Sequence, residues 1–80
     1  SSEFVAIDLG AGKGRDTQFL LNHGGKRILA IESNPAAIQE LKQLQAKYPN
    51  ELSIQARDFQ HMDLQEIGGP IHLINASYAL

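Results

Sequence analysis

The most informative segment of the sequence lies near its start and reads Ile7-Asp8-Leu9-Gly10-Ala11-Gly12-Lys13-Gly14. A short apolar run precedes the glycines, and a helical pattern follows them. Glycine allows a positive φ and lets a ligand lie against bare backbone, and the start of a helix presents unpaired N–H groups. The segment therefore predicts a strand-to-helix loop that binds a nucleotide-like ligand. A tight turn with no ligand is the alternative.

Outward from this loop, short apolar runs predict four strands. Residues 4–7, 28–31 and 71–74 are nearly continuous apolar runs, which suit strands buried on both faces of a parallel sheet. Residues 52–56 alternate between apolar and polar instead. Alternation is typical of a strand with one wetter face, so we expect this strand at an edge of the sheet.

Helical patterns separate the predicted strands. The clearest runs from Pro35 to Tyr48, with Asn34 as a suitable N-cap and Pro35 at the first helical position. Its apolar stripe consists of Ala37, Leu41, Leu44 and Tyr48. An earlier helix is expected from about Gly14 or Arg15 to His23, ended by Gly24-Gly25. A short turn is expected at residues 63–66, before Gly68-Gly69-Pro70.

The resulting order is β-α-β-α-β-(turn)-β, which predicts an α/β domain with a parallel sheet and right-handed crossovers. We expect a single domain over residues 1–80, since the chain is too short for two. Its last predicted strand has the composition of an interior strand. We therefore expect these residues to form the N-terminal part of a larger fold.

The charge and composition of the chain limit the kinds of partner and site that it can have. The net charge is −2 and the seven cationic residues are spread singly or in pairs, so no nucleic-acid partner is indicated. The absence of cysteine excludes disulfides and thiolate metal sites. The apolar runs are far shorter than the roughly 20 residues of a membrane span. We expect a cytoplasmic protein with no membrane segment.

The spacing of the glycines discriminates between the classes of ligand that such a loop can bind. A dinucleotide fingerprint Gly-x-Gly-x-x-Gly, counted from Gly10 and Gly12, would place its third glycine at position 15, where the chain has Arg15. The third glycine stands one residue earlier, at Gly14. A guanidinium at the position where helix and strand pack closely disfavours a pyrophosphate cofactor. A phosphate-binding P-loop also fails, because no Ser or Thr follows Lys13.

The segment Asp8-Leu9-Gly10-Ala11-Gly12-Lys13-Gly14 resembles motif I of the class I S-adenosylmethionine-dependent methyltransferases. Three later segments resemble the same class: Ile31-Glu32-Ser33-Asn34-Pro35, Arg57-Asp58-Phe59 and residues 75–80. Within the class they look most like small bacterial methyltransferases related to the tellurite-resistance group. The resemblance implies a Rossmann-like sheet with strand order 3-2-1-4 and the cofactor S-adenosyl-L-methionine, with S-adenosyl-L-homocysteine as product.

The resemblance also implies a set of cofactor-binding residues. Glu32 would accept from the ribose hydroxyls, Asp58 from the adenine amino group, and Asp8 would lie beneath the methionine moiety and order the loop. The full set is Asp8, Gly10, Ala11, Gly12, Gly14, Glu32, Ser33, Asp58, Phe59 and Asn75. For the three acids the alternatives are structural: a solvated carboxylate near a helix start at Glu32, a local turn bond at Asp58 and a helix cap at Asp8.

No catalytic residue is assigned, because methyl transfer from a sulfonium mainly requires positioning of the two partners. Residues Asn75-Ala76-Ser77-Tyr78 lack the two prolines of the acceptor motif found in amino-methyltransferases, and His72 stands where the class usually has Asp. His61 and Asp63 are too few for a metal site.

Two further functions remain open: an NAD-dependent oxidoreductase domain, and a non-catalytic folding unit that keeps at most cofactor binding. We expect self-association through residues 71–76, where the last strand would present an apolar edge. We also expect weak or absent transferase turnover by the 80 residues alone.

Overall fold

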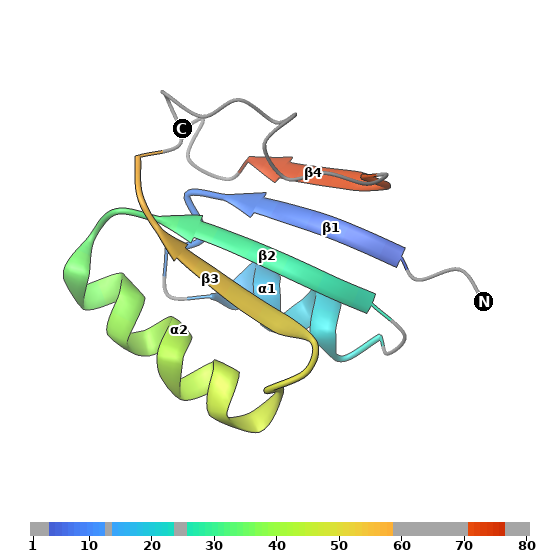
Figure 1. Cartoon of the computed structure of the whole chain (residues 1–80), viewed down its shortest axis with the longest axis horizontal. Helices are drawn as coiled ribbons and strands as arrows, with labels where there is room; N and C mark the ends of the chain where they lie inside the picture. The colour runs from blue at the N-terminus through green and yellow to red at the C-terminus, as the bar shows by residue number, and fades with distance from the viewer. Residues whose placement is uncertain (1–3, 13, 24–25, 59–70, 77–80) are drawn as a thin grey trace.

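The computed structural model describes residues 4–12, 14–23, 26–58 and 71–76 of the chain, and these residues form a parallel sheet with helices on one face (Figure 1). The sheet has four strands in the order β3-β2-β1-β4, and every neighbouring pair is parallel. The elements in chain order are β1 (Phe4–Leu9), α1 (Arg15–Leu21), β2 (Lys26–Glu32), α2 (Pro35–Lys47), β3 (Leu52–Ala56) and β4 (Leu73–Ala76). The Rossmann-like strand order and the edge position of β3 are confirmed.

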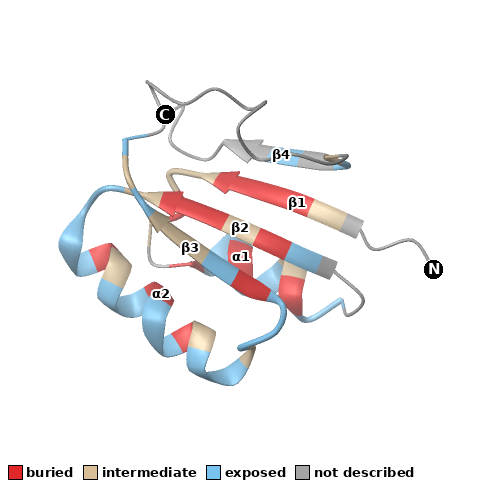
Figure 2. Cartoon of the chain, viewed as in Figure 1, coloured by how far each residue is buried: buried red, intermediate tan, exposed pale blue. Residues whose placement is uncertain are grey.

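The register of the strands sorts the side chains onto two faces. Ala6, Ile28 and Leu52 are aligned across β1, β2 and β3, so their side chains share one face. They belong to the hydrophobic core that α1 and α2 cover (Figure 2). Ile7 and Ile31 point to the opposite face and are also fully buried. Burial on both faces explains why residues 4–7 of β1 and 28–31 of β2 are apolar throughout rather than alternating.

Helix α2 forms as its sequence predicts. The Asn34 side chain accepts a hydrogen bond from the Ala37 N–H at 3.1 Å, and Pro35 occupies the first helical position. Of the apolar stripe, Ala37, Leu41 and Leu44 are buried, while Tyr48 is the C-cap and packs partly buried against the core. The helix thus ends at Lys47, one residue earlier than expected.

Other boundaries differ from the sequence prediction. Helix α1 ends at Leu21 rather than at His23, with Asn22 as its C-cap; the Tyr48 hydroxyl donates to Asn22 Oδ1 at 2.9 Å. Strand β4 begins at Leu73 rather than at residue 71, because its ladder partners on β1 start at Ala6. Strand ends are set by pairing, which an apolar run does not reveal. The expected turn at 63–66 and Gly68-Gly69-Pro70 lie outside the described residues.

The parallel arrangement brings the carboxyl ends of all four strands to one edge of the sheet, marked by the arrowheads in Figure 1. In open parallel sheets ligands bind at this carboxyl edge. Neither of the two described helices is long and apolar enough to cross a bilayer.

Candidate functional site

The glycine loop between β1 and α1 uses its three glycines for their backbone conformation. Gly10, Gly12 and Gly14 have φ values of 64°, 59° and 88°, all in the left-handed region that disfavours other residues. The Gly10 N–H donates to the Ile31 carbonyl at 2.9 Å, which joins the loop to β2, and the Gly14 N–H donates to the Ala11 carbonyl at 3.1 Å. The alternating glycine spacing is therefore required by the path of the chain.

Gly14 and Gly12 differ in the space around them. A Cβ at Gly14 would lie 2.9 Å from Leu41 Cδ2 and 3.3 Å from Leu44 Cδ2, so the start of α1 packs directly on α2. A Cβ at Gly12 would meet no atom within 4 Å. Gly14 thus provides the close packing that a dinucleotide fingerprint would assign to position 15, and Arg15 is exposed. Open space beside Gly12 leaves the backbone at the tip of the loop accessible to a ligand.

Glu32, the last residue of β2, faces the glycine loop with its carboxylate. Its Oε1 accepts from the Gly12 N–H at 2.7 Å, and its Oε2 accepts from the Ser33 N–H at 3.2 Å and the Asn34 N–H at 3.0 Å. The acid and the loop expected to share a ligand are thus in direct contact. Ser33 itself is exposed beside them.

Asp8 lies beneath the loop, fully buried on the helix-facing side of β1. Its Oδ2 accepts from the Thr17 hydroxyl at 2.6 Å, and Thr17 is fully buried as well. Asp8 therefore joins the strand before the loop to the helix after it, which fits the expected role of ordering the loop. The sequence analysis did not name Thr17 as a partner of Asp8. The only indication was a hydroxyl side chain in the first turn of the helix that follows the glycine loop.

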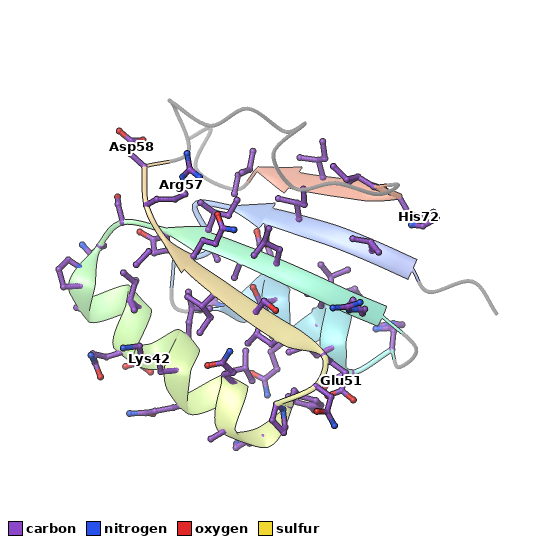
Figure 3. The ribbon with its side chains drawn as sticks, in the orientation of Figure 1. Lys42, Glu51, Arg57, Asp58 and His72 are labelled. Atoms are coloured by element: carbon purple, nitrogen blue, oxygen red, sulfur yellow. The ribbon has the colours of Figure 1, made fainter. Side chains whose placement is uncertain are left out.

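Asp58 and His72 lie at opposite ends of the sheet (Figure 3). Asp58 is exposed just beyond β3, at the carboxyl edge that also holds Glu32. The Arg57 N–H donates to the Glu32 carbonyl at 3.1 Å, so pairing with β2 continues up to the residue before Asp58. His72 lies near the start of β1: its Nδ1 accepts from the Val5 N–H at 3.0 Å, and its own N–H donates to the Val5 carbonyl at 2.9 Å. This position gives His72 a structural role, away from the candidate site.

The remaining predicted residues are only partly described. Ala11 is buried in the loop, and the backbone of Asn75 pairs with Asp8 across β4 and β1. Phe59, His61, Asp63, Ser77 and Tyr78 lie outside the described residues. Within the described part of the chain, no group of three or more His, Asp or Glu side chains is arranged to hold a metal ion.

Structural comparison finds a similar fold in a solved methyltransferase and in a second protein that was crystallised with S-adenosylhomocysteine. A 1,6-didemethyltoxoflavin N1-methyltransferase of Burkholderia thailandensis, with S-adenosylhomocysteine bound, superposes with a TM-score of 0.63 and 28% identity, covering 76% of this chain and 26% of that one. The N-terminal domain of EvdMO1 with S-adenosylhomocysteine bound gives a TM-score of 0.71 at 21% identity, covering 81% and 28%. The latter likeness shows the fold alone.

Sequence comparison points to the same group. Ribosomal RNA small subunit methyltransferase A of Sinorhizobium fredii is 29% identical over 73 residues, covering 90% of this chain and 25% of the relative. The protein of that name from Paramagnetospirillum magneticum is 36% identical over 62 residues, covering 78% and 22%. The chain thus spans about a quarter of the length of these relatives, and the placement beside the tellurite-resistance group stays a prediction. The family model described as "Methyltransferase domain" matches residues 6–80, and the chain belongs to this family.

Proposed function

We propose that this chain is the cofactor-binding part of an S-adenosyl-L-methionine-dependent methyltransferase. The observation that carries the proposal is the contact between Gly12 and Glu32, because it joins a left-handed glycine loop to an acid at the carboxyl edge of the neighbouring strand. Membership of the methyltransferase family supports the choice of cofactor. The proposed site binds S-adenosyl-L-methionine and its product, S-adenosyl-L-homocysteine.

The residues present fit this cofactor at three points. Open space beside Gly12 admits a ligand against the backbone. Glu32 and Asp58 place acceptor oxygens at the ends of adjacent strands, suitable for ribose hydroxyls and an adenine amino group respectively. The buried Asp8 is proposed to attract the ammonium group of the methionine moiety, directly or through water. Gly10, Ala11, Gly14, Ser33, Phe59 and Asn75 complete the proposed set.

When bound, the cofactor supplies a methyl group on a positively charged sulfur, which is already an activated leaving group. The residues of this chain are proposed to bind and orient it rather than to transfer protons. The methyl acceptor belongs to the activity of the whole protein; ribosomal RNA is the acceptor in the names of the relatives above, not an acceptor assigned to this chain.

An amide-resolved NMR titration of the 80-residue chain with S-adenosylhomocysteine tests the proposal, with NAD as the control ligand. We expect shifts at Gly10, Gly12, Glu32 and Asp58 with S-adenosylhomocysteine alone. Shifts at the loop with NAD alone would favour an oxidoreductase domain instead. A dispersed spectrum that responds to neither ligand would favour a folding unit without the function. Turnover with a small acceptor is expected to be weak or absent.

Self-association through residues 71–76 is proposed as a separate property of the chain. Strand β4 is the last strand of the described sheet, and Ile74 is 46% exposed on it. Sedimentation velocity over a range of concentrations tests it: the Ile74→Lys variant is expected to shift the chain toward monomer. A wild-type chain that sediments as a monomer at every concentration contradicts the proposal.

A further inference from the structure

The hydrogen bond between Gly12 and Glu32 joins the tip of the glycine loop to the end of the neighbouring strand β2. The donor and acceptor are separated by 20 residues of sequence and by 2.7 Å in space. Such a length is at the short end of the range for an N–H···O hydrogen bond. We propose that Glu32 is a positioning residue that holds the tip of the glycine loop, in addition to its proposed contact with a ribose.

The chain around Glu32 orients its carboxylate toward the loop. The N–H groups of Ser33 and Asn34 both donate to Oε2, which leaves Oε1 directed at Gly12. Asn34 is itself fixed as the N-cap of α2 through its bond with the Ala37 N–H. The turn between β2 and α2 therefore determines where Oε1 lies, and Oε1 in turn determines where Gly12 lies.

The two ends of the loop are held differently from its tip. The N–H of Gly10 donates to a carbonyl of β2, and that of Gly14 to the carbonyl of Ala11, so backbone acceptors hold both ends. Gly12 donates to a side chain, and no atom would lie within 4 Å of a Cβ there. The conformation of the tip thus depends on Glu32 more than on packing, and this residue can be altered without rebuilding the backbone.

The same carboxylate couples the loop to the ligand, a step that rests on the proposed function. An ionised carboxylate has about four acceptor positions, and three are used by the N–H groups of Gly12, Ser33 and Asn34. The remaining position is on Oε1. A ribose hydroxyl accepted there shares its oxygen with Gly12, so the order of the loop and the affinity for the nucleoside depend on one atom.

The Glu32→Asp variant tests the proposal because it shortens the side chain by one methylene and keeps its charge. An aspartate can still accept from the N–H two residues on, here that of Asn34, but it no longer reaches Gly12. In the ligand-free 80-residue chain, hydrogen exchange at the Gly12 amide is expected to become at least about tenfold faster in the variant, because a bond to a charged acceptor is lost. Its amide proton is expected to move upfield.

Two controls separate this effect from a general loosening of the fold. The Gly10 amide, whose acceptor is the Ile31 carbonyl, is expected to keep its exchange rate and chemical shift. The Glu40→Asp variant, which makes the same change at an exposed position of α2, is expected to leave Gly12 unchanged. Equal protection of Gly12 in the wild-type and Glu32→Asp chains, or no protection in the wild type, overturns the positioning role.

Titration of both chains with S-adenosylhomocysteine tests the coupling. We expect roughly tenfold weaker binding by the Glu32→Asp variant; equal affinity overturns the coupling. If the ligand binds neither chain while Gly12 still differs between them, the proposed function fails and the positioning role stands.

Discussion

Alanine at Gly14 is expected to destabilise the protein more than alanine at Gly12, although both changes add the same methyl group to a left-handed residue. A non-glycine residue in this region costs roughly 1–2 kcal/mol, so Gly12→Ala, whose Cβ enters open space, is expected to cost about 1–2 kcal/mol. At Gly14 the Cβ would lie 2.9 Å from Leu41 Cδ2 and 3.3 Å from Leu44 Cδ2. Crowding of a packed core adds about 1–3 kcal/mol, for a total of about 2–5 kcal/mol.

Equilibrium unfolding in urea measures both costs. With an m-value of about 1 kcal/mol per molar urea for a small domain, the midpoint is expected to fall by about 1–2 M for Gly12→Ala and by about 2–5 M for Gly14→Ala. Adding Leu41→Val to Gly14→Ala shortens the side chain that the new methyl group meets. The combined cost is therefore expected to be smaller than the sum of the two single costs. Equal midpoints for the two alanine variants, or a strictly additive double variant, would refute the packing argument.

Three further substitutions test contacts described above, each by urea unfolding. Thr17→Val removes the hydroxyl that donates to the buried Asp8 and is expected to lower the free energy of unfolding by about 1.5–3 kcal/mol. Thr17→Ser keeps the hydroxyl and is expected to retain most of this stability. Equal losses in the two variants would contradict the hydrogen-bond account. Asn34→Ala removes the cap of α2 and is expected to cost about 1 kcal/mol, with Asn34→Asp near the wild type. His72→Phe removes the ring acceptor of the Val5 N–H at an exposed position and is expected to cost about 0.5–1 kcal/mol without changing S-adenosylhomocysteine binding. Weakened binding in this last variant would place His72 in the site after all.

The parts of the fold that depend on residues close together in the sequence were predictable from the sequence. Helix α2 follows from a cap, a proline and an apolar stripe that all lie within its own length. The edge position of β3 follows from its alternation, because an edge strand with a wet face needs fewer apolar residues. The three glycines indicated a left-handed loop for the same local reason.

Contacts between residues far apart in the chain were not predictable in the same way. The start of β4 is fixed by the pairing of Leu73 with Ala6, and His72 bonds to Val5 across 67 residues. The resemblance implied a ribose contact for Glu32, which stays a prediction. It did not indicate the contact with Gly12, because the reach of the Glu32 side chain depends on how β1 and β2 lie side by side. Geometry of this kind is absent from any local pattern.

The contact of Gly14 with Leu41 and Leu44 also constrains how this protein can vary. The same two leucines fill the interior and form the support on which the loop rests, so a change in their size alters both at once. Elsewhere in the interior, neighbouring side chains can repack around a substitution. At Leu41 and Leu44 the same substitutions are expected to destabilise the protein more, because these side chains face the backbone of Gly14, which cannot repack. Any attempt to redesign the interior for greater heat resistance must therefore keep the shape of these two leucines, or the conformation of the glycine loop will change with it.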